Sequence, residues 1–172
     1  MTEPAGSIAG SPVRVAFFAG QVLSPDDLRA EQDYHRGMRY LHNRLLHGRG
    51  IVEGFAVEAV DGGIHVSPGL ALDPLGRELV LGDRAELDLP PEAGVEEQTT
   101  WWVVATWDEI PSAPVAHEAG SRFSRWIERC ALHIDPVAPD ATGPGLLIAT
   151  LSATAGTVAE IDTSGRRLVR GG

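Results

Sequence analysis

The sequence predicts an α+β protein, with one long N-terminal helix followed by a mainly antiparallel β-sandwich or small barrel. Two observations lead to this prediction. Between residues 24 and 47, apolar side chains recur at helical spacing. After Gly50 the pattern changes to short runs separated by turn residues, which is typical of antiparallel strands. We therefore expect an N-terminal arm and long helix over residues 1–50 and a β-rich domain over residues 51–172.

The predicted helix has clear start and stop signals. Ser24 suits the N-cap, Pro25 suits the first helical position, and the two aspartates that follow favour the positive end of the helix dipole. Glycines at positions 48 and 50 provide the stop. The helix is therefore expected to run to about Leu46 or His47.

The apolar stripe of this helix is narrow, and arginine and acidic residues flank it. Its seam has 4-3-4 spacing and consists of Tyr34, Met38, Leu41 and Leu45. So narrow a stripe favours packing on a single surface or a seam shared between chains. We predict the shared seam, in which these four residues form the interface of a homo-oligomer.

The rest of the chain is predicted as short strands and turns. Asp61-Gly62-Gly63 is a strong hairpin signal, and Asp73-Pro74-Leu75-Gly76 predicts a tight turn. Strands are expected at 51–60, 64–66, 70–72, 78–81, 85–89, 99–107, 123–134, 146–151 and 158–161. Loops are expected at 90–97, 111–120 and 136–145. Residues 13–19 suit a strand or an extended lead-in, and the tail from 164 to 172 is expected to be loosely held unless a partner orders it.

Composition excludes several classes of function. The chain has 172 residues, a net charge of −10 and no lysine, which excludes Schiff-base chemistry and a phosphate-loop lysine. Residues 51–120 hold fourteen acidic residues and two arginines, which argues against nucleic acid as a partner. A single cysteine excludes an internal disulfide framework and suits a reducing compartment. No apolar run is long enough to span a membrane, and the N-terminus does not resemble a signal peptide.

Several residue groups are candidates for catalytic or metal sites, and a structural role is the alternative for each. His35 and His42 are seven residues apart on the helix, too far along its axis to bind one ion in one chain, although a ring of histidines around an oligomer axis stays open. Cys130 and His133 are three residues apart, so a strand would point them to opposite faces. We therefore expect no catalytic residue, no metal and no cofactor.

Acidic and aromatic residues offer two further alternatives. The adjacent pairs 96–97 and 108–109 are acidic but do not fix the separation that a glycosidase needs. The tryptophans could serve the core, a carbohydrate platform or a contact between chains; they are Trp101, Trp102, Trp107 and Trp126.

Five stretches of the sequence resemble one group of small bacterial proteins. The matching stretches are residues 17–28, 30–35, 41–48, 67–78 and 161–168. The group is associated with phage-tail-like contractile injection systems and their baseplate or tail-fibre components. This chain departs from the group's pattern at Ala19, where an acidic residue is usual, and at Glu53, where a cysteine is usual.

The resemblance implies a non-catalytic structural or adaptor subunit of such a particle, for baseplate or tail-fibre attachment. It implies a cytoplasmic protein assembled into the particle, with other subunits as partners and without membrane insertion. The alternative is a carbohydrate-binding or cell-surface-recognition module. The oligomer number, the neighbouring subunits and any glycan ligand stay open at this point.

Overall fold

The computed structural model describes residues 11–91, 98–117 and 120–169. The α-helix α1 (Pro25–His42) continues into the short π-helix η1 (Asn43–His47). The strands that follow are β1 (Gly50–Gly54), β2 (Val57–Val60), β3 (Gly63–Val66), β4 (Gly69–Leu72), β5 (Glu78–Leu81), β6 (Ala85–Asp88), β7 (Thr99–His117), β8 (Gly120–Asp135), β9 (Leu146–Thr154) and β10 (Thr157–Asp162). The predicted α+β class is confirmed.

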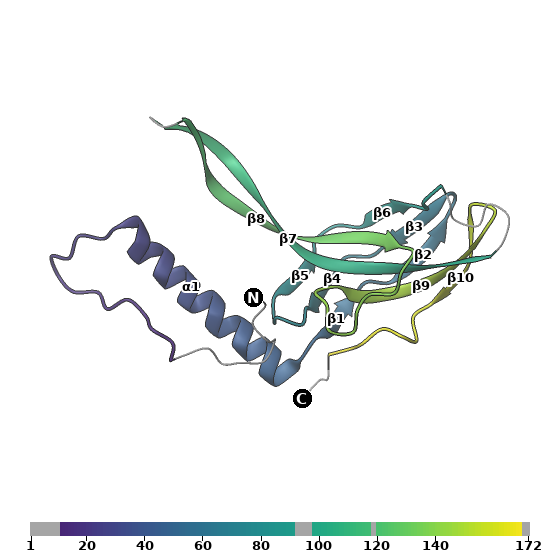
Figure 1. Cartoon of the computed structure of the whole chain (residues 1–172), viewed down its shortest axis with the longest axis horizontal. Helices are drawn as coiled ribbons and strands as arrows, with labels where there is room; N and C mark the ends of the chain where they lie inside the picture. Colours follow the sequence, from purple (N-terminus) through teal and green to yellow (C-terminus); the bar gives the residue numbers. More distant parts are fainter. Residues whose placement is uncertain (1–10, 92–97, 118–119, 170–172) are drawn as a thin grey trace.

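The strands form a sandwich of two layers (Figure 1). One layer is the antiparallel sheet β10-β9-β7-β8, and the other consists of the antiparallel sheets β1-β4-β5 and β2-β3-β6. Fully buried side chains from the two layers meet in one core, among them Phe55, Ile64 and Leu79 from one layer and Val103 and Ile148 from the other. Burial of this apolar surface is the main force that holds the layers together.

The two smaller sheets are joined by a bend at Phe55. Phe55 is fully buried and has a positive φ of 54°, which is unusual for a side chain of its size. The backbone pairing continues across the bend, because Phe55 N donates to Pro68 O and Ser67 N donates to Ala56 O. The bend therefore curls this layer around the core without breaking its hydrogen bonds.

The helix begins as its sequence predicts. Asp27 N donates to Ser24 Oγ at 3.2 Å, and Ser24 N donates to the Asp27 carboxylate at 2.8 Å, so the two residues form a capping box. The helix extends through η1 to His47, which confirms its predicted length. No residue of α1 is buried, so the helix makes little contact with the sandwich of its own chain.

The expected loop at 111–120 is wrong, because β7 runs on to His117 and β8 begins at Gly120. The two strands form a long two-stranded ribbon. Beyond Ala105, β7 no longer pairs with β9, so its outer edge has no neighbouring strand in the described structure. Proline is tolerated on such an edge, so Pro111 and Pro114 are compatible with a strand here. In the sequence, the same two prolines favour a loop.

The two ends of the described chain differ from each other. Residues 11–19 form no strand, so the lead-in is extended. The tail is held more firmly than expected: Leu168 bridges Ile51, Ile51 N donates to Arg167 O at 2.8 Å, and Val169 N donates to Ile51 O at 2.9 Å. The sequence did not predict this pairing, because it depends on a strand more than a hundred residues away. Most of the expected acidic loop, residues 92–97, lies outside the described residues.

Candidate functional site

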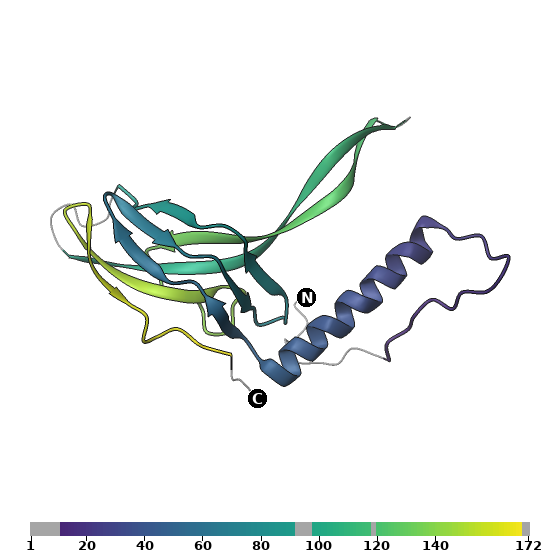
Figure 2. The same cartoon turned by 180° about the vertical axis from the view of Figure 1, so that it is seen from behind.

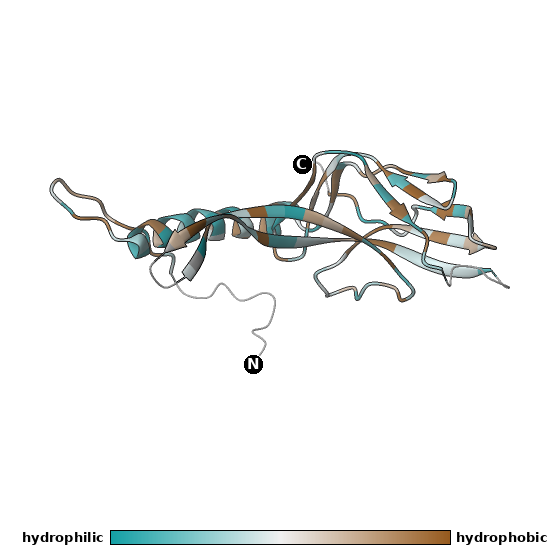
Figure 3. Cartoon of the chain, turned by 90° about the horizontal axis from the view of Figure 1, so that it is seen from above, coloured by the Kyte–Doolittle hydropathy of each residue, from teal (hydrophilic) through white to brown (hydrophobic). Residues whose placement is uncertain are grey.

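The helix and the ribbon form two arms that extend side by side from one end of the sandwich (Figures 1 and 2). Seen from above, the arms extend in the same direction (Figure 3). Neither arm is covered by the sandwich: α1 has no buried residue, and the exposed fractions at the ribbon are 53% for Phe123 and 62% for Trp126. Uncovered apolar surface of this extent is typical of a contact surface.

The helix is anchored to the sandwich through one turn. Asn43 is buried, and its Nδ2 donates to Gly76 O at 2.9 Å and to Glu78 Oε1 at 2.8 Å. Arg39 Nε forms an ion pair with the same carboxylate at 3.0 Å. Gly76 has a φ of +85°, and a Cβ at this position would lie 2.1 Å from Tyr40 O. The turn between β4 and β5 therefore fits the helix only with glycine at this position.

A buried ion pair connects the same turn to the ribbon. Asp73 is fully buried, and its carboxylate accepts from Leu75 N, from Arg77 N and, at 2.6 Å, from Arg77 Nε. The Arg77 guanidinium lies over the ring of Trp107 on β7, with 4.5 Å between its carbon and the ring centroid. We call residues 73–78, together with Asn43 and Trp107, the joint, because they connect both arms to the sandwich.

Opposite charges face each other between the arms. Glu109 and Glu128 are cross-strand partners at the base of the ribbon, an arrangement of like charges that is unfavourable by itself. The Tyr40 side chain and these two carboxylates raise the pKa of the Arg36 guanidinium, so Arg36 lies near all three. A cleft of about 330 Å³ separates the arms here, lined by Arg39, Glu78, Val80, Glu128 and Arg129. The helix therefore offsets the negative charge of the ribbon base.

The predicted seam lies on the outer side of the helix. Successive residues of an α-helix are rotated by about 100°, so Tyr34, Met38 and Leu41 lie opposite Arg36, which lies near the ribbon base, and Asn43, which belongs to the joint. Met38 and Leu45 are 37% and 57% exposed, and Tyr34 and Leu41 are half-buried. The seam therefore lies on the face of the helix that points away from the joint. Its role as an interface stays a prediction.

Further apolar side chains extend this uncovered surface. The lead-in before the helix is largely hydrophobic (Figure 3), and its exposed residues are Val13, Phe17, Phe18, Val22 and Leu23. On the ribbon, Val115 and Ile127 accompany Phe123 and Trp126. The sequence alone did not predict a surface at the lead-in or at the ribbon. Their only signal was the presence of aromatic residues in segments rich in glycine or proline.

Within the described residues, the chemical candidates have separate local partners; the acidic pair 96–97 lies outside the described residues. Burial raises the pKa of the Cys130 thiol to about 11, which makes it a poor nucleophile at neutral pH. His133 hydrogen-bonds Thr106 at 3.1 Å, and Asp108 forms an ion pair with Arg129 that lowers the pKa of the carboxyl. Within the described residues there is no group of three or more His, Cys, Asp or Glu side chains that could hold a metal ion.

The histidines of the helix have local partners. His35 contacts Glu31 at 3.0 Å, and the Nε2 atoms of His42 and His47 lie 3.3 Å apart. Of the tryptophans, Trp101 is a core residue, whereas Trp126 lies exposed on the ribbon. The described part of the chain has no helix with the length and apolar character needed to cross a membrane.

No protein-family model and no curated protein matches the sequence. The fold, however, is similar to solved structures. A chain in the crystal structure of TssK is 12% identical, with a TM-score of 0.53, over 88% of this chain and 41% of that one. A chain in the cryo-electron microscopy structure of the type VI secretion system TssK–TssF–TssG baseplate subcomplex is 14% identical, with a TM-score of 0.52, over 88% of this chain and 60% of that one. This chain thus matches only part of each, and identities this low show a shared fold alone.

Proposed function

We propose that this chain is a non-catalytic structural or adaptor subunit of a phage-tail-like contractile injection particle, at its baseplate or tail-fibre attachment. The main observation behind the proposal is that the two arms expose apolar side chains that the rest of the chain does not cover. Exposed apolar surface of this kind is typical of a site that a partner protein covers. The fold is shared with chains of a baseplate subcomplex, and this likeness supports the same kind of assembly. In this reading the protein acts in the cytoplasm as part of the particle, without nucleic acid and without membrane insertion.

The proposed assembly includes contacts between copies of this chain. The outer seam of Tyr34, Met38, Leu41 and Leu45 would pack against a second copy, while the joint holds the helix in place. Burying a large apolar side chain contributes roughly 1.5–3 kcal/mol, so four such residues from each copy are enough for a specific contact if the helix is already ordered. Other subunits of the particle would contact the lead-in.

Light scattering with matched variants tests the contact between copies. Met38→Glu places a carboxylate in the seam, and Gln32→Glu places one on an exposed position of the same helix outside the seam. We expect the wild type and Gln32→Glu to associate at micromolar concentration and Met38→Glu to be shifted toward monomer. A wild type that stays monomeric up to high micromolar concentration would contradict self-association.

Deletion of the gene tests the role in the particle. We expect cells of the source organism that lack the protein to yield no assembled sheath-bearing particles by electron microscopy. The wild-type gene should restore assembly, and the Met38→Glu gene should restore little of it. Normal particles in the deletion strain would overturn the proposal.

A second candidate function rests on Trp126, whose 62% exposed indole offers a stacking surface for a sugar ring. A carbohydrate-binding module would show tryptophan fluorescence that changes with cell-surface polysaccharide, and Trp126→Ala would abolish the change. The absence of any response to host glycans would remove this candidate and leave the structural role.

A further inference from the structure

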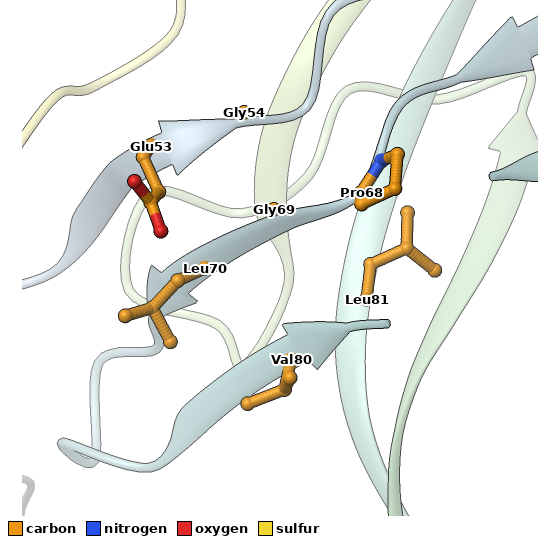
Figure 4. Close-up of a pocket in the computed structure, with 7 residues that line it drawn as sticks. All are labelled: Glu53, Gly54, Pro68, Gly69, Leu70, Val80 and Leu81. Carbon is orange, nitrogen blue, oxygen red and sulfur yellow. The ribbon is translucent and has the colours of Figure 1, made fainter. Parts of the chain in front are cut away.

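The outer face of the sheet β1-β4-β5 carries an apolar groove with one charge (Figure 4). Its volume is about 520 Å³, and its lining includes Leu70, Val80 and Leu81. Glu53 is the only charged residue of the lining and is exposed. Val80 is 58% exposed, although it belongs to a regular strand of the sandwich. The groove therefore suits a large apolar side chain that is accompanied by a cation.

The ribbon presents a side chain of this kind. Trp126 is 62% exposed, and side chains two residues apart on a strand share a face, so Arg122 lies on the same face of β8 as Trp126. The two residues are four positions apart, about 13 Å along the strand. In the described part of the chain, no ion pair involves Arg122 or Glu53.

The tryptophan does not occupy the groove of its own chain. β8 contacts the groove sheet near Cys130 and Leu81, and from there the ribbon leads away from the sandwich (Figures 1 and 2). Trp126 lies four residues further out, and the ladder between β7 and β8 continues to Gly120. Trp126 is 62% exposed and is not among the residues that line the groove, so the groove is open to the tryptophan of a second molecule.

We propose that Trp126 of one copy inserts into the groove of a second copy, beside Leu70 and Val80, with Arg122 facing Glu53. This inference deepens the self-association in the proposed function and rests on it. Tryptophan and arginine are enriched among the residues that dominate binding at protein interfaces, and a carboxylate at the rim fixes orientation. Arg122 and Glu53 carry opposite charges, and the groove volume of about 520 Å³ is large enough for a tryptophan side chain.

The proposed contact joins two different surfaces. Each copy would give its ribbon to one neighbour and receive a ribbon from another. Such a head-to-tail contact builds a closed ring if the rotation between neighbours closes, and a filament if it does not. The helix seam is a separate surface, so the two contacts can be lost independently.

Cross-linking of two different cysteine variants tests the contact. One variant carries Trp126→Cys, the other carries Val80→Cys, and both carry Cys130→Ser. We expect a disulfide-linked dimer on a non-reducing gel when the two are mixed and oxidised. The matched control replaces Trp126→Cys by Phe123→Cys, because Phe123 is exposed at the opposite face of the same strand. Equal yields from both mixtures, or no cross-link from the first, would overturn the inference.

Association measurements separate this inference from the proposed function. Trp126→Ser should weaken self-association by about 30-fold, as expected for a central tryptophan, and Phe123→Ser should change it little. Glu53→Arg and Arg122→Glu should each weaken it, and the double variant should recover most of the loss. If Trp126→Ser associates like the wild type while Met38→Glu dissociates, the inference is wrong and the proposed self-association stands. A monomeric wild type would overturn both.

Discussion

Arg77 stacks over Trp107, with 4.5 Å between the guanidinium carbon and the centroid of the indole ring. The same guanidinium holds the buried carboxylate of Asp73. Trp107 lies just beyond the point where β7 leaves its pairing with β9 at Ala105. The stacked pair therefore fixes the base of the ribbon against the turn that also anchors the helix.

The first prediction concerns this buried pair. Asp73→Ala should lower the free energy of unfolding by about 3–5 kcal/mol, because it leaves the Arg77 charge without its partner in the interior. Arg77→Lys should lower it less, by about 1–3 kcal/mol, since lysine keeps the charge but loses the planar stack. Urea unfolding followed by tryptophan fluorescence measures both. Arg84→Lys, at an exposed arginine, is the control and should have little effect; equal effects at positions 77 and 84 would contradict the assigned role of the stack.

The second prediction compares two glycines. Gly62 and Gly76 have φ values of +75° and +85°, but a Cβ at Gly62 meets nothing within 4 Å, whereas at Gly76 it lies 2.1 Å from Tyr40 O. Gly62→Ala should cost about 1–2 kcal/mol of backbone strain alone. Gly76→Ala should cost clearly more, because the helix must also move away from the turn. Equal costs in urea unfolding would show that the helix does not depend on this close approach.

The third prediction is a slow reaction of Cys130. Because burial raises its pKa to about 11, the thiolate is only about a thousandth of the total at pH 8. Iodoacetamide should therefore modify the folded protein far more slowly than a Cys130→Ser variant that carries Ser124→Cys at an exposed position of the ribbon. The raised pKa also means that this group's contribution to stability is complete below pH 9.0 and is lost as the pH rises toward 11. Equal rates of modification would contradict the burial.

The fourth prediction concerns the pH dependence of the helix cap. Backbone and side-chain hydrogen bonds from Ser24 lower the pKa of Asp27. A lowered pKa stabilises the folded state above the ordinary value of 3.8, and this contribution is lost as the pH falls through the folded pKa. Ser24→Ala should raise the pKa of Asp27, as measured by NMR titration. Ser164→Ala is the matched control, because Ser164 lowers the pKa of Asp162 in the same way and lies at the other end of the chain.

The fifth prediction tests whether the seam is shared. Leu41→Ala should lower the melting temperature, and the loss should depend on protein concentration because a shared contact follows mass action. High salt should weaken the association if the acidic middle segment and the arginines attract each other across the contact. Melting temperatures that are independent of concentration in both the wild type and the variant would show that the helix serves its own chain alone.

Local signals in the sequence predicted the helix and most strands correctly. The helix cap needs only Ser24 and Asp27, and the hairpin at Gly62 needs only its turn residues, so both could be read from neighbouring positions. The ribbon could not, because Pro111 and Pro114 are acceptable only where β7 has lost its second neighbour. The tail pairing of Leu168 with Ile51 likewise depends on contacts distant in sequence.

The candidate site was only partly predictable for the same reason. Helical spacing identified Tyr34, Met38 and Leu41 as one face. The joint could not be predicted, because Asn43 and Gly76 are 33 residues apart in the sequence. The residues at 73–76 predict a turn, but they carry no signal that the helix attaches there. An asparagine at the end of a helix otherwise looks like an ordinary polar residue.

Among the residues that the structure describes, the ribbon beyond Ala105 pairs only with itself, and a two-stranded hairpin without a third strand or a covering layer is marginally stable in water. Its amide protons should therefore exchange with solvent through local openings while those of β9, in the middle of its sheet, exchange only on global unfolding. A partner that covers the ribbon would slow exchange at its outer end before it slows exchange anywhere in the sandwich. The outer ribbon is thus a built-in reporter of assembly, which hydrogen exchange can follow residue by residue.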